Sequence, residues 1–467
     1  MTVLGAVSIC FGGLRQRRRR RPCRNQEGRR PVVAAATVRV ARWVRRHWPR
    51  QPAPEAAKAT EELAGPEERD WSALPDDLLL IAMASMEVLD VVQSGAVWRS
   101  AYAQFRRLRL PAKPNPPPCL LHTRAADGAA AIYSLSTGAT FPCGAVGSGV
   151  FVAGSAHGWV FAVDEARAYP FLLNPLTGAR AALPPLATLE RIKGTSVDAD
   201  GSVVYDVDHW CGTFAATAAM GVEPVTARRA RSWMFRRVAI SAAGVVLLVH
   251  MPYGEASYAR PGDERWTSLS SAAPDLKRFF LHPISAAIHN KDNNLFYMAC
   301  EGGIVLSVDL SGPAPVGRLV SYMVREIRPN YKYSYYLVFR GKDLLLVTRR
   351  LLLTRPREGE KDVSTTGVSI DKVCFSTPEL HGNGIGDDYA LFLGHNEPMC
   401  LPVKDYPMLR RNCAYLADDS EQHFLPITRQ DVGIWDFGSS TMEKQFGGDL
   451  QPWMDEQPPI WITPSLY

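Results

Sequence analysis

The residues best suited to chemistry in this 467-residue chain are short clusters of Gly, Asp, His and Cys. The segment 381–388 reads HGNGIGDD, and alternating glycines before acidic residues are typical of a phosphate-binding loop. Such a loop needs a helix directly after it, so that the helix N-terminus faces the anion. Here the strand-like run YALFLG follows instead. The sequence therefore predicts a turn before a strand.

Two further clusters contain residue types that bind metals. Asp198-Ala199-Asp200-Gly201 matches part of a calcium loop, but the spacing differs and no Glu completes it. His209 and Cys211 offer two ligands, but no second pair follows at zinc-site spacing. We expect a β-turn at 198–201, a core position for His209-Trp210-Cys211, and neither a metal nor a cofactor.

Catalytic motifs are missing from the sequence: it has no G-x-S-x-G, H-E-x-x-H or Walker-type pattern. The acidic pairs Asp387-Asp388 and Asp418-Asp419 are adjacent, and neighbouring side chains on a strand point to opposite faces. These pairs suit solvated turns better than general acid–base chemistry. We therefore expect no catalytic residues, no cofactor-binding residues and no enzymatic activity of the chain's own.

The elements that would hold these residues are mostly β-strands. Pro111 to Pro118 reads PAKPNPPP, which can form neither a helix nor a central strand, so a domain boundary is expected there. The large domain, 119–467, consists of short β-type runs separated by turns, as in LFYMACEGGIVLSVDL and YYLVFRGKDLLLVTRR. The apolar run VVLLVH at 245–250 suits a strand buried on both faces.

Hairpins at this density, without long helical periods, predict a mainly β fold. A β-propeller of six or seven blades, at roughly 40–50 residues each, accommodates the 349 residues of the large domain. A pair of β-sandwiches is the alternative, although it would more naturally divide into separate domains.

A small module of three short helices is predicted before that boundary, at 70–110. Pro75 suits the first turn of a helix, and Asp76 and Asp77 follow it where acidic side chains interact favourably with the helix dipole. Apolar residues then recur at helical spacing: Leu78, Leu79, Ala82 and Met86. Helices this short bury too little apolar surface to be stable alone, so the module needs a partner or a docked domain.

The N-terminal arm and linker, 1–69, differ in charge from the rest of the chain. The first 50 residues hold 14 arginines, no lysine and one acidic residue, and residues 51–467 carry a net charge of −7 against +6 for the whole. We expect the arm to be disordered. Its arginine spacing is compatible with a nuclear-import patch, an organelle presequence or a membrane-surface helix.

The composition also bears on location and partners. Nine scattered cysteines without a CxxC pair indicate reduced thiols, as in the nucleus and/or cytoplasm. No run of about 18 uncharged apolar residues occurs, so we expect no membrane span and no membrane partner. A nucleic-acid partner would rest on the basic arm alone, and we do not expect one.

The module resembles an F-box. The pattern W-S-x-L-P-D-D-L-L is followed by a helix, by Leu89-Asp90 and by V-W-R-S, although the stretch before Trp98 is about three residues shorter than in the family. F-box helices bind a Skp-type adaptor, which links them to a cullin ubiquitin ligase. The resemblance implies these adaptor-facing residues: Leu74, Pro75, Leu78, Leu79, Val91, Val97 and Trp98. The alternative is a helical cap on the next domain.

The large domain resembles the KIB-type β-propellers of plant F-box proteins, a family greatly expanded in grasses and formerly a domain of unknown function. The resemblance rests on FLLNPLTGARAALPPL (171–186), on 386–419 and on DVGIWDFGSSTMEKQF (431–446). It implies substrate recognition for a ubiquitin ligase, and one branch of the family is associated with restraining a kinase of hormone signalling.

These resemblances predict a non-catalytic substrate receptor of a Skp-cullin-F-box ubiquitin ligase, with an unknown protein substrate held by the propeller. Catalysis of ubiquitination would belong to partner enzymes. The alternative is a scaffold or stoichiometric inhibitor that binds a signalling kinase without a ligase, which the shortened F-box pattern favours. A glycosidase-type propeller would need an acid pair that the sequence does not offer.

Overall fold

The structure is a computed structural model, and the residues it describes belong to a single unit within Leu74–Tyr467. They are 74–112, 115–124, 128–209, 221–279, 282–322, 331–354, 361–373, 385–417, 419, 427–429, 431–443 and 458–467. The predicted basic arm, 1–69, lies outside the described residues, as do 381–384 and Trp210-Cys211. No helix among the described residues is long and apolar enough to cross a membrane.

Three short helices open the described chain, as predicted: α2 (Asp76–Ser85), α3 (Val88–Val97) and α4 (Arg99–Arg107). Pro75 precedes the first helical residue of α2, and Asp76 and Asp77 lie in its first turn. The helices enclose a small apolar core. Its fully buried side chains include Met83, Val91 and Phe105.

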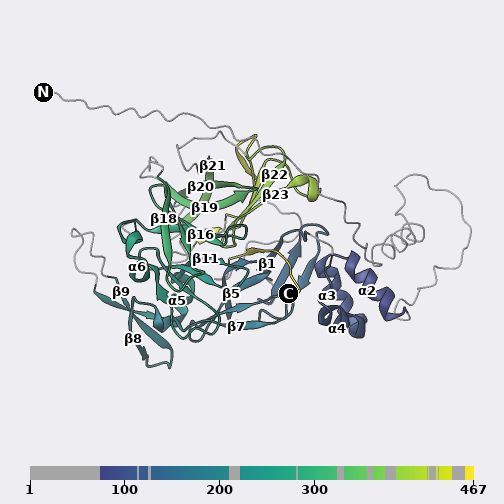
Figure 1. The fold of residues 1–467 in the computed structure, drawn as a ribbon, viewed down its shortest axis with the longest axis horizontal. Coiled ribbons are helices and arrows are strands. Elements are labelled where there is room, and N and C mark those ends of the chain that lie inside the picture. Colours follow the sequence, from purple (N-terminus) through teal and green to yellow (C-terminus); the bar gives the residue numbers. More distant parts are fainter. Residues whose placement is uncertain are drawn as a thin grey trace, which may run out of the picture. The chain divides into compact units, whose positions relative to one another are not determined.

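The remaining elements form seven β-sheets among the described residues (Figure 1). The first sheet contains, in spatial order, β28 (Ile460–Ile462), β1 (Cys119–Thr123), β2 (Ala130–Ser134) and β3 (Thr140–Pro142). The second contains β4 (Val150–Ala156), β5 (Trp159–Asp164), β6 (Pro170–Leu173) and β7 (Arg180–Ala182). The third sheet contains β11 (Phe235–Ile240), β12 (Val246–His250), β13 (Glu255–Ala259) and β14 (Thr267–Ser268). The fourth contains β15 (Ile284–Asn290), β16 (Leu295–Cys300), β17 (Ile304–Asp309) and β18 (Val316–Tyr322).

Two further sheets follow in the ring and one lies outside it. The fifth is β19 (Lys332–Arg340), β20 (Asp343–Thr354), β21 (Lys361–Lys372), β25 (Ile427–Arg429), and the sixth is β23 (Met399–Pro402), β22 (Tyr389–Leu393), β24 (Cys413–Leu416), β26 (Gly433–Asp436), β27 (Thr441–Glu443). The seventh has three strands, β8 (Ile192–Val197), β9 (Val203–Asp208) and β10 (Val222–Thr226). Short helices α5 (Ala227–Trp233) and α6 (Leu269–Ala272) and single 3-10 turns connect strands.

Six of the sheets form a closed ring. The innermost strands contact one another in series, from β28 to β4, β11, β15, β19 and β23. Thr463 and Met399 then join β28 to the sixth sheet, with the Thr463 hydroxyl 3.3 Å from the Met399 sulfur. A separate apolar cluster fills the space between each pair of neighbouring sheets. The prediction of a propeller of six or seven blades is therefore confirmed, and the blades number six.

Ring closure depends on β28. This strand pairs antiparallel with β1, so the first sheet combines strands from both ends of the domain. Trp461 of β28 is fully buried and packs edge-on against Phe392 of β22. The third sheet supplies the central strand β12, whose five residues are all buried, as VVLLVH predicted.

The sheet formed by β8, β9 and β10 stands outside the series of inner strands and projects away from the ring (Figure 1). Its Asp198 side chain accepts hydrogen bonds from the Asp200 and Ser202 amides at 3.0 and 2.8 Å. That geometry is an Asx-type turn, so the turn predicted in place of a calcium loop is confirmed.

A buried ionic network joins the fifth and sixth sheets to the third. Arg349 of β20 is fully buried and binds the carboxylates of Asp419 at 3.1 Å and Asp431 at 2.8 Å. Asp419 also accepts from Arg237 of β11 at 2.7 Å and from the Tyr336 hydroxyl at 2.9 Å. Burial alone would raise the pKa of Asp419, but the two arginines outweigh it and lower that pKa. The expectation of a solvated turn is therefore wrong for Asp419.

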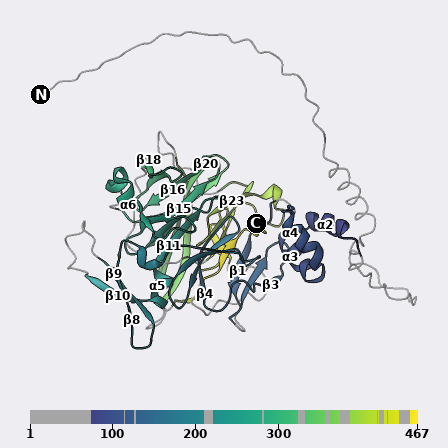
Figure 2. The same cartoon turned by 60° about the horizontal axis from the view of Figure 1, so that its bottom comes forward.

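The module packs onto the propeller next to the first sheet, and the C-terminus lies beside the helices (Figure 2). Leu89 of α3 belongs to the apolar cluster between the first and second sheets, and Leu466 completes the core of the module. The Tyr467 hydroxyl donates to the carbonyls of Phe105 and Leu110 at 3.2 and 3.1 Å. The module is thus docked as a cap, which supplies the burial that three short helices lack.

Replacing Arg349 by Met should destabilise the fold by about 3–5 kcal/mol, because two buried carboxylates lose their cation. Arg350 is the matched control, since it lies one residue along β20, is partly buried and binds Thr366. Arg350→Met should cost at most about 1 kcal/mol. Chemical denaturation followed by tryptophan fluorescence measures both values. Equal losses in the two variants would contradict the role given to the network.

Candidate functional site

The seven predicted adaptor-facing residues divide into three groups in the structure. Leu78 is 40% and Val97 68% exposed, and Pro75 is exposed as well. Leu74 and Trp98 are half-buried against the core of the module. Leu79 and Val91 are buried within that core. A partner can reach the first group directly, whereas Leu79 and Val91 contact other residues of the module.

The exposed residues lie at one end of the module. The Ser100 hydroxyl, in the first turn of α4, donates to Asp76, in the first turn of α2, at 3.2 Å. This contact places the start of α2, with Pro75 and Leu78, next to the junction of α3 and α4, which carries Val97. We call Pro75, Leu78 and Val97 the module end. These apolar side chains are exposed at the ends of the helices and are available to a partner.

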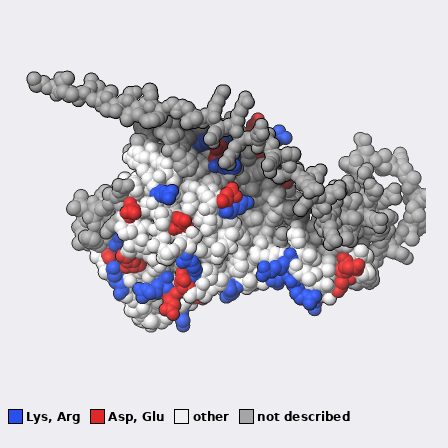
Figure 3. All heavy atoms as spheres, in the orientation of Figure 1, with Lys and Arg blue, Asp and Glu red and all other residues white. Residues whose placement is uncertain are grey.

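On the face of the molecule drawn in Figure 3, acidic and basic side chains of the described residues are interspersed. No single sign of charge dominates there.

The propeller has a cavity of about 650 Å³ where its inner strands end. Turns from four sheets and β28 converge on it, and we call it the mouth cavity. Its lining residues include Ser155, His157, His289, Lys291, Asp292, Phe339, Lys342, Glu397, Met399, Cys400 and Trp461. A cavity of this size matches those that bind small ligands or single side chains.

Glu397 is the carboxylate of the mouth cavity, and its side chain is only 11% exposed. Burial raises the pKa of Glu397 to about 8, although a hydrogen bond from the His289 backbone amide opposes the rise. The His157 imidazole lies 3.6 Å away, but burial, His289 and Lys291 lower the pKa of His157. With a pKa of about 8, the Glu397 carboxyl is mostly protonated and neutral at neutral pH.

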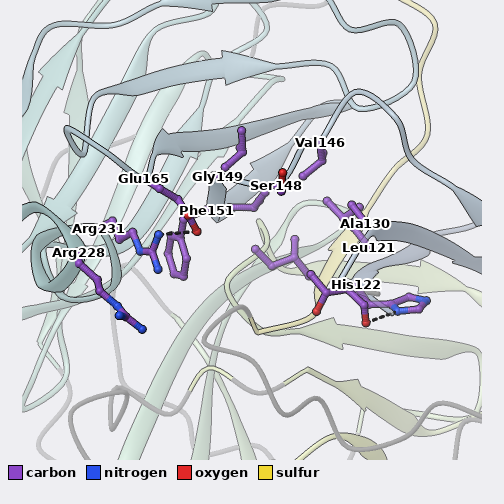
Figure 4. Close-up of a pocket in the computed structure, with 16 residues that line it drawn as sticks. Leu121, His122, Ala130, Val146, Ser148, Gly149, Phe151, Glu165, Arg228 and Arg231 are labelled. Carbon is purple, nitrogen blue, oxygen red and sulfur yellow. Dashed lines mark hydrogen bonds and ion pairs between the residues drawn. The ribbon is translucent and has the colours of Figure 1, made fainter. Parts of the chain in front are cut away.

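A second cavity, of about 510 Å³, lies at the other end of β4 (Figure 4). The residues before β4 line it, whereas the last residues of β4 line the mouth cavity. Arg231 of α5 forms an ion pair with Glu165 on one wall, and His122 lies on the other. The His122 ring bonds the Thr123 carbonyl at 3.1 Å, and burial lowers the pKa of His122.

The other candidates from the sequence have structural roles where they are described. Asp387 and Asp388 form the turn before β22, as predicted. His209 is partly buried, stacks on Trp233 at 5.4 Å between ring centroids, and pairs with Glu223 at 3.2 Å. Within the described part of the chain, no three His, Cys, Asp or Glu side chains gather as metal ligands would.

Sequence reasoning did not find Glu397. It lies in GHNEPMC, which carries no recognised motif, and only the ring brings it close to His157 and His289.

A closed ring of six four- or five-stranded blades, with cavities at both ends of its inner strands, defines the class of protein as a β-propeller. A family model for the KIB1-4 β-propeller matches residues 132–436, which is more than half of the chain. The chain therefore belongs to the KIB1-4 β-propeller family. The match begins at Ile132, after the helical module, and no F-box family model matches.

The chain is also similar, at low identity, to several solved structures. AztD from Citrobacter koseri is 10% identical, with a TM-score of 0.27 and coverage of 74% of this chain and 97% of that chain. A chain of the nidogen/laminin complex is 10% identical, with a TM-score of 0.27 and coverage of 57% of this chain and 94% of that chain. Virginiamycin B lyase from Staphylococcus aureus is 11% identical, with a TM-score of 0.24 and coverage of 49% and 79%. No curated protein matches the chain.

Replacing Glu397 by Gln should stabilise the protein at high pH and leave its stability unchanged at low pH. The folded pKa of about 8 exceeds the ordinary 4.5, so the wild type loses stability as pH rises from about 4.5 to 8. Gln cannot ionise and avoids this loss. At pH 9 the gain should be on the order of 2–4 kcal/mol, because water at the mouth screens part of the burial cost.

Thermal unfolding at pH 5 and pH 9 tests this expectation. Glu264→Gln is the control, because Glu264 is exposed and lies outside both cavities. A gain that is equal at the two pH values would show that Glu397 is ionised throughout.

Proposed function

We propose that this protein is a substrate receptor of a Skp-cullin-F-box type ubiquitin ligase. The module end binds the Skp-type adaptor, and the propeller binds a protein substrate. The chain itself performs no catalysis. It raises the local concentration of substrate lysines near the enzyme that transfers ubiquitin.

The observation that carries this proposal is the module end. Leu78 and Val97 are large apolar side chains left exposed at one end of a helical module, and both belong to the F-box-like pattern. The module is docked on the propeller through other residues, Leu89 and Leu466. Docking therefore uses one surface and leaves the module end open to a partner.

The second candidate function is a scaffold or stoichiometric inhibitor that binds a signalling kinase without a ligase. The positions of Leu79 and Val91 favour it, because an adaptor that used these residues would have to open the core of the module. The family match, which covers the propeller and not the helices, is compatible with either function.

Changing Leu78 and Val97 together to Asp should weaken binding to a purified Skp-type adaptor by well over 100-fold. Burial of one such side chain contributes about 1.5–3 kcal/mol, and about 1.4 kcal/mol is a factor of ten. Both residues are exposed, so the variant should fold normally. Leu79 is left unchanged because it stabilises the module.

The matched control is Val197→Asp, because Val197 is 66% exposed on β8 and Val97 is 68% exposed. The control should bind the adaptor like the wild type. Titration calorimetry with the full chain measures each affinity. A wild type that does not bind the adaptor would contradict the ligase role and favour the scaffold. Equal binding by the double variant would show that the adaptor uses another surface.

A further inference from the structure

The mouth cavity offers hydrogen-bond acceptors. Glu397 supplies a carboxyl group, and His289 is only 4% exposed. The His289 Nε2 lies 3.1 Å from the Asn294 side-chain oxygen, which can only accept, so Nε2 carries the proton. The other ring nitrogen, Nδ1, is then an acceptor, and it has no partner among the described residues. A buried acceptor of this kind is normally satisfied by a donor, which a ligand side chain can supply.

The walls and rim of the cavity define the rest of the ligand. Phe339 and Met399 line it and suit the aliphatic stem of a long side chain. Lys291 and Lys342 are exposed at the rim, on the β15–β16 and β19–β20 turns, and Asp292 is the acidic residue beside them. The interior therefore offers acceptors to a hydrogen-bond donor, and Glu397 becomes the counter-ion of a cation once it loses its proton, whereas the rim favours negative charge.

We propose that the mouth cavity docks a lysine or arginine side chain of a protein partner, with acidic residues next to it in the partner's sequence. The cation forms an ion pair with Glu397 and donates to His289, and the acidic neighbours meet Lys291 and Lys342. This inference rests on the proposed function in one respect: it identifies the recognition element of the substrate that the receptor would hold.

The ion pair couples binding to a proton. Glu397 is mostly protonated below its pKa of about 8, so a cation that binds there must displace that proton. The affinity for the cation should therefore increase by up to about tenfold for each pH unit between 6 and 8. It should then level off between pH 8 and 9, for a total increase of up to about 100-fold. The neighbouring His157 and His289 both have lowered pKa values because of burial, and burial raises the pKa of Cys400 to about 12. Their titration therefore does not produce this rise.

The experiment uses the full chain and a library of nine-residue peptides. Every peptide position is randomised over all amino acids except cysteine. The wild type should select Lys or Arg at one position, with Asp or Glu at its neighbours. Glu397→Gln should lose the basic preference, and it should fold because the native side chain is already neutral at pH 7. Changing Lys291 and Lys342 together to Ala should lose the acidic preference but keep the basic one. Glu264→Gln is the control and should select like the wild type.

Fluorescence anisotropy of the best selected peptide then measures affinity at pH 6, 7, 8 and 9. The wild type should show the rise with pH, and Glu397→Gln should show none. Selection without a basic residue, no selection at all, or a basic preference that survives in Glu397→Gln would each overturn the proposal. The Leu78/Val97 double Asp variant should select the same peptides, so failure of adaptor binding and failure of the mouth site are distinguishable.

Discussion

The pairing of β28 with β1 is the constraint on which the rest of the structure depends. It places a late strand of the chain innermost in the first sheet and so closes the ring. Residues of β28 reach both cavities, since Ile460 lines the second cavity and Trp461 lines the mouth cavity. The segment that follows carries Leu466 and Tyr467 into contact with the helical module. Closure of the propeller and docking of the module therefore depend on the same C-terminal segment.

This arrangement has a consequence for function. The same segment borders the mouth cavity at Thr463 and packs against the helices through Leu466, so it connects the module to the mouth. In a receptor that presents a substrate to a separate enzyme, the connection between its two binding surfaces sets the effective concentration of the substrate. Within the propeller, the buried network around Arg349 joins three sheets through Asp419 and Asp431.

Much of the fold could be predicted from the sequence because its signals are local. Proline before α2, apolar residues at helical spacing and glycine-containing turns such as 301–303 are each contained within a few residues. The number of blades could not be predicted from these local signals, because it depends on the packing between sheets.

The candidate sites were predicted less completely, for a physical reason. An apolar stripe on a helix does not reveal whether it faces a partner or the molecule's own core, so Leu79 and Val91 were grouped with Leu78 and Val97. From the sequence, Asp419 is predicted to be a surface acid. In the fold it contacts Arg237 and Arg349, which are 182 and 70 residues away in the chain. The pKa of Glu397 is raised only because the ring buries its side chain, and no local sequence signal indicates that burial.

Hydrogen–deuterium exchange of the full chain, with and without a purified Skp-type adaptor, tests the central claim most directly. Our account predicts that the adaptor slows exchange in α2 and at the junction of α3 and α4, where Leu78 and Val97 lie, and leaves the strands around the mouth cavity unchanged. Unchanged exchange throughout the module, or protection confined to the propeller, would contradict it.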